Sequence, residues 1–112
     1  FAHAKDAIEH VTTLAPTDAK VFFTYAVLTQ RTGDTKKAIE IFKKTIELKP
    51  DYLDAYYYLA NAYRDLAIDK NGTVVDPAMQ EKAVASMQYI LKNLSPNNLE
   101  VTKTLKSWNV SP

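Results

Sequence analysis

The feature that most limits which folds this chain can adopt is a pattern of side chains that recurs before its prolines. Pro16 and Pro50 lie 34 residues apart, and Pro50 and Pro96 lie 46 apart, which is 34 plus 12. Before each proline, four side chains follow one another at intervals of four, three and three residues, with a last interval of four before Pro96. They are Ala4, Ile8, Val11 and Leu14, then Ala38, Phe42, Thr45 and Leu48, then Ala83, Met87, Ile90 and Leu94. Such intervals place the side chains on one face of a helix, and the long period predicts stacked helical repeats.

A second pattern precedes the first in two of the three units. It appears as Phe22, Tyr25, Ala26 and Thr29 and again as Tyr56, Leu59, Ala60 and Tyr63. Its small residues are informative, because a methyl side chain lets a neighbouring helix approach closely. We expect Ala26 and Ala60 to be buried at helix crossings. Ala38 and Ala83 would allow the same approach from the partner helices, so each unit is predicted to be a pair of packed helices.

Together these patterns resemble the tetratricopeptide repeat family, whose 34-residue signature reads W-x2-L-G-x2-Y, then A-x3-F, then P. Residues 19–52 match it with Phe22, Tyr25, Ala26, Gly33, Ala38, Phe42 and Pro50. Residues 53–98 match it with Tyr56, Leu59, Ala60, Tyr63, Ala83, Met87 and Pro96, around an insertion at 68–76. The resemblance implies an all-α fold, a right-handed solenoid of antiparallel helix pairs. Thr29 and Thr45 depart from it, where the family prefers an aromatic residue and alanine.

The whole chain is expected to form one domain of about six helices. They are predicted at about 2–14, 18–31, 35–48, 52–67, 77–94 and 98–108. Residues 1–16 resemble the second helix of a preceding repeat, followed by repeats at 19–52 and 53–98. Residues 98–108 are expected to form a capping helix with an apolar stripe of Val101, Leu105 and Trp108, and Lys106 would block a further repeat.

The predicted turns carry recognisable helix-capping residues. Asp18 and Asp76 can accept hydrogen bonds at the starts of the second and fifth helices, and Pro77 suits a first helical position. Gly33 is expected to adopt the left-handed conformation. Asn97 and Asn98 are predicted to cap the sixth helix.

The insertion at 68–76 contains Asn71-Gly72, a tight-turn signal. It is interpreted either as a lengthened, mobile connection or as a loop that overhangs a binding face. Asn71-Gly72-Thr73 also fits an N-glycosylation acceptor, although so short a match is frequent by chance. A calcium loop is excluded, because Ala67 and Ala78 would occupy its first and last ligand positions.

Composition and charge exclude several classes of function. The chain has no cysteine, which excludes disulfides, cysteine-based zinc sites and a cysteine nucleophile, and its net charge of +1 gives no strong field for nucleic acid. No apolar run is long enough to span a bilayer. His3 and His10 lack a third metal ligand. We therefore predict a protein that is not an enzyme, with no cofactor, no metal, no nucleic-acid partner and no membrane insertion by this segment.

The family lines its concave groove with residues of the first helix of each repeat. Carried over by register, these are Lys20, Phe23, Thr24, Val27, Gln30 and Arg31, then Asp54, Tyr57, Tyr58, Asn61, Arg64 and Asp65. The predicted peptide groove consists of Phe23, Val27, Arg31, Tyr57, Asn61 and Arg64, since aromatic residues and arginine commonly dominate such interfaces. A clamp for a peptide carboxylate is disfavoured, because Phe23 and Val27 replace the lysine and asparagine it needs.

The predicted function is a scaffold module that binds a protein or peptide partner through this groove. The alternative is the C-terminal soluble tail of a larger bacterial membrane enzyme of surface-polysaccharide assembly, a polymerase or ligase. The first helix is expected to leave Phe1 and Ala7 uncovered, which predicts a homodimer through the N-terminal helix. The cytoplasm is the favoured compartment, and the periplasmic or extracellular side stays open for a segment attached to a membrane protein.

Overall fold

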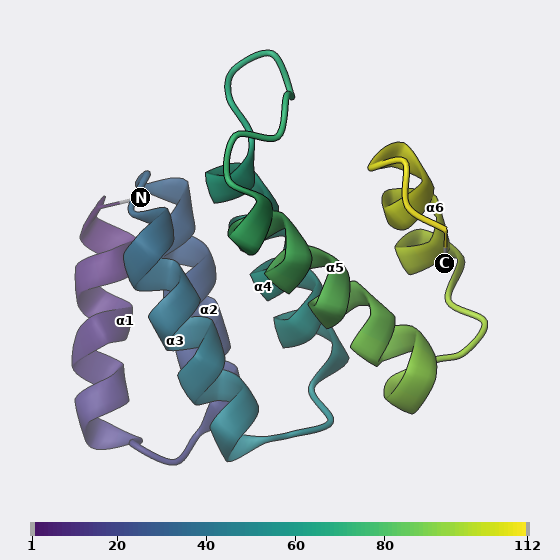
Figure 1. The fold of residues 1–112 in the computed structure, drawn as a ribbon. Helices are drawn as coiled ribbons and strands as arrows, with labels where there is room; N and C mark the ends of the chain where they lie inside the picture. Colours follow the sequence, from purple (N-terminus) through teal and green to yellow (C-terminus); the bar gives the residue numbers. More distant parts are fainter. Residues whose placement is uncertain (1, 112) are drawn as a thin grey trace.

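The structure is a computed structural model that describes residues 2–111 and the side chains of residues 6–111. The described residues form six α-helices and one π-helical segment (Figure 1). These are α1 (Ala2–Leu14), α2 (Ala19–Arg31), α3 (Thr35–Leu48), α4 (Leu53–Ala67), α5 (Pro77–Tyr89), η1 (Ile90–Leu94) and α6 (Leu99–Ser107). The all-α fold of repeated helix pairs predicted from the sequence is confirmed, and the predicted helix bounds agree with it closely.

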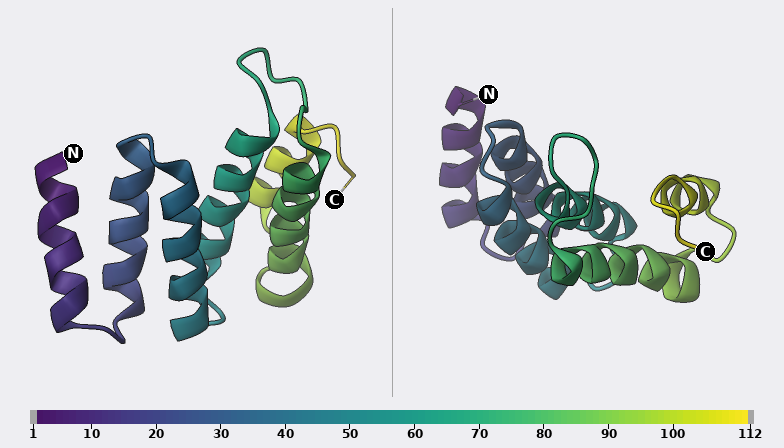
Figure 2. Two further views of the ribbon diagram at one scale, coloured as in Figure 1. Left: turned by 60° about the vertical axis from the view of Figure 1, so that its left-hand side comes forward. Right: turned by 45° about the horizontal axis from the view of Figure 1, so that its top comes forward.

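Successive helices from α1 to α5 alternate in direction and lie in two layers, with α1, α3 and α5 in one and α2 and α4 in the other (Figures 1 and 2). Helix α2 packs along α3, and α4 packs along α5. The four alanines predicted at helix crossings, Ala26, Ala38, Ala60 and Ala83, have no exposed surface. Their small side chains bring the paired helices close together, as the sequence pattern predicted.

The turns between helices use the predicted capping chemistry. Asp18 Oδ1 accepts hydrogen bonds from the backbone N–H groups of Lys20 and Val21 at the start of α2. Gly33 has a φ of 96°, a conformation that a side chain would strain. Of the two asparagines before α6, Asn98 is the one that caps the helix, and its Oδ1 accepts the N–H of Val101.

The fifth predicted helix is continuous but changes its winding near the end. The α-helix ends at Tyr89, and Ile90–Leu94 continues it as a π-helix, in which the N–H of Ser95 donates to the carbonyl of Ile90 at 2.7 Å. A π-helical turn holds one more residue than an α-helical turn. The extra residue in the interval from Ile90 to Leu94 is accommodated in this way, so Ile90 stays fully buried and Leu94 half-buried.

Two clusters of buried side chains form the core. The first joins α2, α3, α4 and α5 around Phe42, and the second joins α4, α5, η1 and α6 around Met87. Trp108 follows α6 and packs against both clusters. Val101 and Leu105 have no exposed surface, so the predicted apolar stripe of the last helix is what docks it on the repeats.

The insertion forms an ordered turn that projects beyond the ends of the helices (Figure 1). Ile68 and Val74 form an antiparallel bridge, and Asp69 Oδ1 accepts the backbone N–H groups of Asn71 and Thr73 at 2.9 and 3.0 Å. Gly72 has a φ of 81°, as expected of this turn. The segment is a hairpin-like loop with its own hydrogen bonds.

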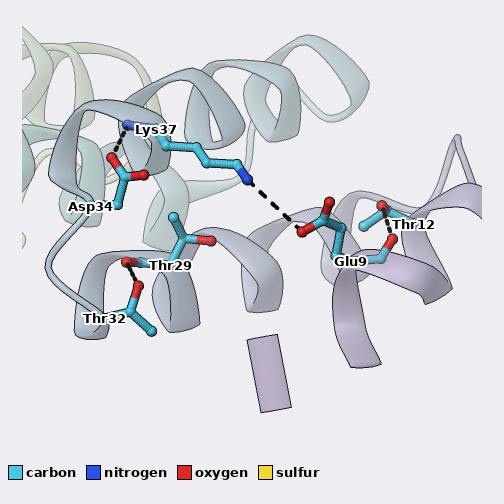
Figure 3. Close-up of polar contacts among 6 residues, drawn as sticks. All are labelled: Glu9, Thr12, Thr29, Thr32, Asp34 and Lys37. Atoms are coloured by element: carbon cyan, nitrogen blue, oxygen red, sulfur yellow. Dashed lines mark hydrogen bonds and ion pairs between the residues drawn. The ribbon is translucent and has the colours of Figure 1, made fainter. Parts of the chain in front are cut away.

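Helix α1 rests on the rest of the molecule along one side. The Oε2 of Glu9 lies 3.9 Å from Lys37 Nζ of α3, and Thr12 is buried with its hydroxyl donating to the carbonyl of Glu9 (Figure 3). On the other side Ala7, Val11 and Leu14 are exposed. The prediction that Ala7 stays uncovered is confirmed, whereas Phe1 and the side chain of His3 lie outside the described residues.

Candidate functional site

Four aromatic rings form a continuous row across α2 and α4. The ring of Phe23 stacks on that of Tyr52, with centroids 5.1 Å apart, and meets the edge of Tyr58 at 5.2 Å. Tyr58 in turn contacts Tyr57 at 6.3 Å. We call Tyr52, Phe23, Tyr58 and Tyr57 the aromatic row. Aromatic pairs in these geometries are stabilising, so each ring helps to hold the next in place.

The helical register explains why these rings meet. Tyr57 and Tyr58 each lie three or four residues from both Asp54 and Asn61, so these four side chains share one broad face of α4. The ring of Phe23, on α2, contacts Tyr58 on this face of α4. Tyr57 connects the same face to α6, because the phenol oxygen of Tyr57 lies 3.1 Å from Thr104 Oγ1. We call the surface formed by α2, α4 and α6 the inner face.

A cavity of about 260 Å³ opens on the inner face between the first turns of α4 and α6. We call it the α4–α6 pocket. It is lined by Leu53, Asp54, Tyr57, Tyr58, Asn98 and Glu100. One end of the aromatic row therefore forms a wall of a cavity that also carries two carboxylates.

The other end of the row borders a wider and more open depression. Lys20, Lys49 and Asp18 line it together with Tyr52, and the Lys49 ammonium lies 5.3 Å from the centre of the Tyr52 ring. Burial raises the pKa of Tyr52, and the negative charges of Asp54 and Asp18 raise it further. The Tyr52 end of the aromatic row is thus bordered by two lysines and Asp18, and the Tyr57 end by the carboxylates of Asp54 and Glu100.

The structure places the six predicted groove residues in different situations. Phe23 and Tyr57 belong to the aromatic row and are half-buried. Val27 is half-buried against the first core cluster, and Arg31 is exposed at the end of α2. Asn61 is half-buried, and its Nδ2 donates to the carbonyl of Tyr57 at 2.9 Å.

Arg64 is occupied by contacts within the molecule. Its Nη1 donates to Gln80 Oε1 of α5 at 2.7 Å, and its guanidinium lies 5.4 Å from the centre of the Trp108 ring. These contacts tie α4 to α5 and to the end of α6. Sequence register could not reveal them, because Gln80 and Trp108 approach Arg64 only after the helices pack.

Gln30 and Asp65 connect α2 and α4 near their last turns. Gln30 Nε2 donates to Asp65 Oδ2 at 3.4 Å. Burial raises the pKa of the Asp65 carboxyl, and the hydrogen bond from Gln30 acts in the opposite direction. The family register assigned both residues to the groove, and in the structure their hydrogen bond joins α2 to α4.

Residues that the six-residue prediction left out also contribute to the inner face. Tyr52 precedes α4 and has no place in the helical register, yet its ring begins the aromatic row. Glu100 and Thr104 come from the capping helix, to which no binding role was assigned. Two sequence signals pointed to this region, the groove register and the crowding of tyrosines between residues 52 and 63.

Neither a metal-binding cluster nor a membrane-spanning helix occurs among the described residues. Among these residues, no group of three or more histidine, aspartate or glutamate side chains could hold a metal ion. No helix within residues 2–111 has the length and apolar character needed to cross a membrane. The arrangement is suited to contact with another molecule through aromatic surface and charge.

A family model and solved structures show what this chain is similar to. Residues 31–66 match a family model described as TPR repeat, a range that includes α3 and nearly all of α4. The crystal structure of MamA protein is similar over 97% of this chain, with a TM-score of 0.62 and 22% identity, which shows a shared fold. The match covers 49% of the MamA chain, so this chain spans about half of that length. No curated protein matches the sequence.

Proposed function

We propose that this chain, which belongs to the tetratricopeptide repeat family, binds a peptide segment of a partner protein along its inner face. Tetratricopeptide repeats generally mediate protein–protein interaction. In this proposal the chain is a non-catalytic binding module. The same surface would bind a partner protein if this chain were the C-terminal tail of a larger bacterial membrane enzyme.

The observation that carries this proposal is the aromatic row. Tyr58 retains 37% of its surface and Phe23 and Tyr57 are half-buried, so parts of three neighbouring rings are available to a ligand. Aromatic side chains held by their neighbours give large contact area at little cost in conformational entropy, and they dominate many interfaces. Val27, Arg31 and Asn61 would extend the contact surface, and Arg64 would support it from within by holding α5 and Trp108.

A peptide-display experiment on the immobilised protein tests this function. Peptides selected from a random library should lose about tenfold or more in affinity for the Tyr58→Ala variant. Tyr89→Ala is the matched control, because Tyr89 is 38% exposed and stacks on Tyr56, away from the aromatic row. Equal binding by wild-type protein and the Tyr58→Ala variant would overturn the proposed site.

We also propose that two copies associate through the exposed side of α1. Ala7, Val11 and Leu14 lie three or four residues apart, which aligns them in one apolar stripe, and Leu14 is 72% exposed. A two-fold contact through one such stripe closes after two copies. Light scattering should give a dimer mass for the wild type and a monomer mass for Leu14→Lys. A monomer mass for both would contradict the dimer.

A further inference from the structure

The α4–α6 pocket has a chemical character that the rest of the inner face lacks. Tyr57 and Tyr58 line it together with Asp54 and Glu100, beside Leu53 and Asn98. Its volume of about 260 Å³ is below the range typical of drug-sized ligands, so it suits a single side chain. The pocket therefore has the dimensions of a subsite within a longer groove.

The polar groups of the pocket differ in whether they already have partners. Asn98 Oδ1 caps α6 by accepting the N–H of Val101, and the phenol group of Tyr57 pairs with Thr104. Within residues 6–111, by contrast, no hydrogen bond or ion pair involves the side-chain carboxylate of Asp54 or of Glu100. What the pocket offers a ligand is thus two carboxylates, parts of two aromatic rings and the apolar side chain of Leu53.

Among residues 6–111, no lysine or arginine side chain forms an ion pair with either carboxylate at this end. Lys103 lies three residues after Glu100 on α6 but forms no ion pair with it. The lysines that border the aromatic row, Lys20 and Lys49, line the depression at its other end. The two ends of the row therefore differ in charge.

Carboxylates beside aromatic rings are the combination that recognises an organic cation. A guanidinium or ammonium group is attracted to the face of a tyrosine ring, and a planar guanidinium also matches the geometry of a carboxylate. An acidic side chain would be repelled here, and a purely apolar one would leave two carboxylates partly desolvated without partners. Charge complementarity thus selects one class of occupant.

We propose that the α4–α6 pocket receives an arginine or lysine side chain of the bound peptide. This inference rests on the proposed function, since it names one side chain of the ligand that the inner face takes. The pocket sets which peptides bind, while the aromatic row supplies contact area that depends less on sequence. The insertion at 68–76 follows the opposite end of α4, about 20 Å along the helix, and takes no part.

The probe for this inference is N-acetyl-L-arginine methylamide, titrated into the labelled protein and followed by the shifts of backbone amide signals in NMR spectra. We expect shifts concentrated in residues 53–58 and 98–104. N-acetyl-L-citrulline methylamide has nearly the same shape without the charge and should bind about five- to tenfold more weakly. Equal shifts with both compounds, or none in these residues, would overturn the inference.

Variants test the two carboxylates directly. The double variant Asp54→Asn with Glu100→Gln should bind the arginine compound about five- to tenfold more weakly, and raised salt should weaken binding by the wild type. Asp51→Asn with Glu81→Gln removes two exposed carboxylates that do not line the pocket and should leave binding unchanged. Thermal unfolding of both double variants separates lost binding from lost structure. Unchanged binding by the first double variant would contradict the inference.

Displayed peptides separate this inference from the proposed function. Selected peptides that depend on Tyr58 but tolerate replacement of every arginine and lysine by citrulline and norleucine would support the peptide-binding function. They would contradict the inference that the pocket receives a basic side chain. If the arginine compound binds the pocket but no peptide depends on Tyr58, the pocket does bind a basic group, and the proposed peptide-binding function is wrong. Peptides that need both Tyr58 and a basic residue would support the two together.

Discussion

The phenol oxygen of Tyr57 lies 3.1 Å from the hydroxyl oxygen of Thr104 and so connects α4 to α6 across 47 positions of the sequence. Tyr57 was predicted to project into the groove as a peptide anchor. Its ring does form part of the inner face, but its hydroxyl is used to hold the capping helix. Replacing the whole side chain would therefore disturb α6 as well as any bound peptide, which is why Tyr58 is the better residue for the binding test.

Removing only this hydroxyl should weaken the attachment of α6. The Tyr57→Phe variant should lose about 0.5–1.5 kcal/mol of unfolding free energy, the usual contribution of one hydrogen bond. Thr104→Val should cost a similar amount, and chemical denaturation of the two single variants and the double variant gives the coupling between them. Strictly additive losses would show that the two hydroxyl groups do not interact.

Thr29 offers a way to stabilise the protein. Its side chain has no exposed surface, and its Oγ1 has no hydrogen-bond partner among the described residues, while Thr32 uses the carbonyl of Thr29 (Figure 3). Thr29→Val removes a hydroxyl that is buried without a partner and keeps the shape, so it should raise the unfolding free energy by about 1 kcal/mol.

Thr45→Val is the matched control for Thr29→Val. Thr45 is equally buried, but its Oγ1 donates to the carbonyl of Ile41 at 3.0 Å. Its replacement should give no gain or a small loss in thermal unfolding. A gain at Thr45 as large as that at Thr29 would show that the missing partner is not the cause.

Ala60 should not tolerate a larger side chain. It has no exposed surface and belongs to the second core cluster with Met87. Ala60→Leu should overpack this contact and destabilise the fold by about 1–3 kcal/mol, measured by denaturation. Ala85→Leu, on the exposed side of α5, serves as the control and should change stability little. An unchanged melting curve for Ala60→Leu would reject the assigned register.

Tyr56 should make stability sensitive to strongly alkaline pH. Burial raises the pKa of Tyr56 to about 12, and hydrogen bonding and charge interaction with Tyr89 contribute. The pKa in the unfolded chain is the ordinary value of about 10, so ionisation favours unfolding. The contribution of Tyr56 is fully present below pH 10 and is lost as the pH rises from about 10 to about 12.

Ultraviolet absorbance of tyrosinate measures this ionisation. A titration step near pH 12 should be present in the wild type and missing from Tyr56→Phe, and Tyr58→Phe should retain it. A wild type without such a step, at a pH where circular dichroism still shows the folded protein, would contradict the prediction.

The proline period and the positions of small residues were sufficient to predict the helical pairs. These features act locally or between adjacent helices. Four-residue and three-residue intervals set one face of each helix, and Ala26 and Ala60 set where neighbours approach. The π-helical turn corresponds to the extra residue in the interval from Ile90 to Leu94. The sequence showed this residue but not how the helix would accommodate it.

The binding surface depended on contacts between residues far apart in the chain. Register alone assigned Phe23 and Tyr57 to a groove, but it could not tell that Arg64 would be held by Gln80 and Trp108. Nor could register predict that Glu100 of the capping helix and Asp54 would line one pocket.

The sequence by itself thus determined which helices form and how neighbours pair, because helical periodicity is local. Only the tertiary structure decided which side chains remain available to a ligand, because that depends on how each helix is covered by elements distant in sequence.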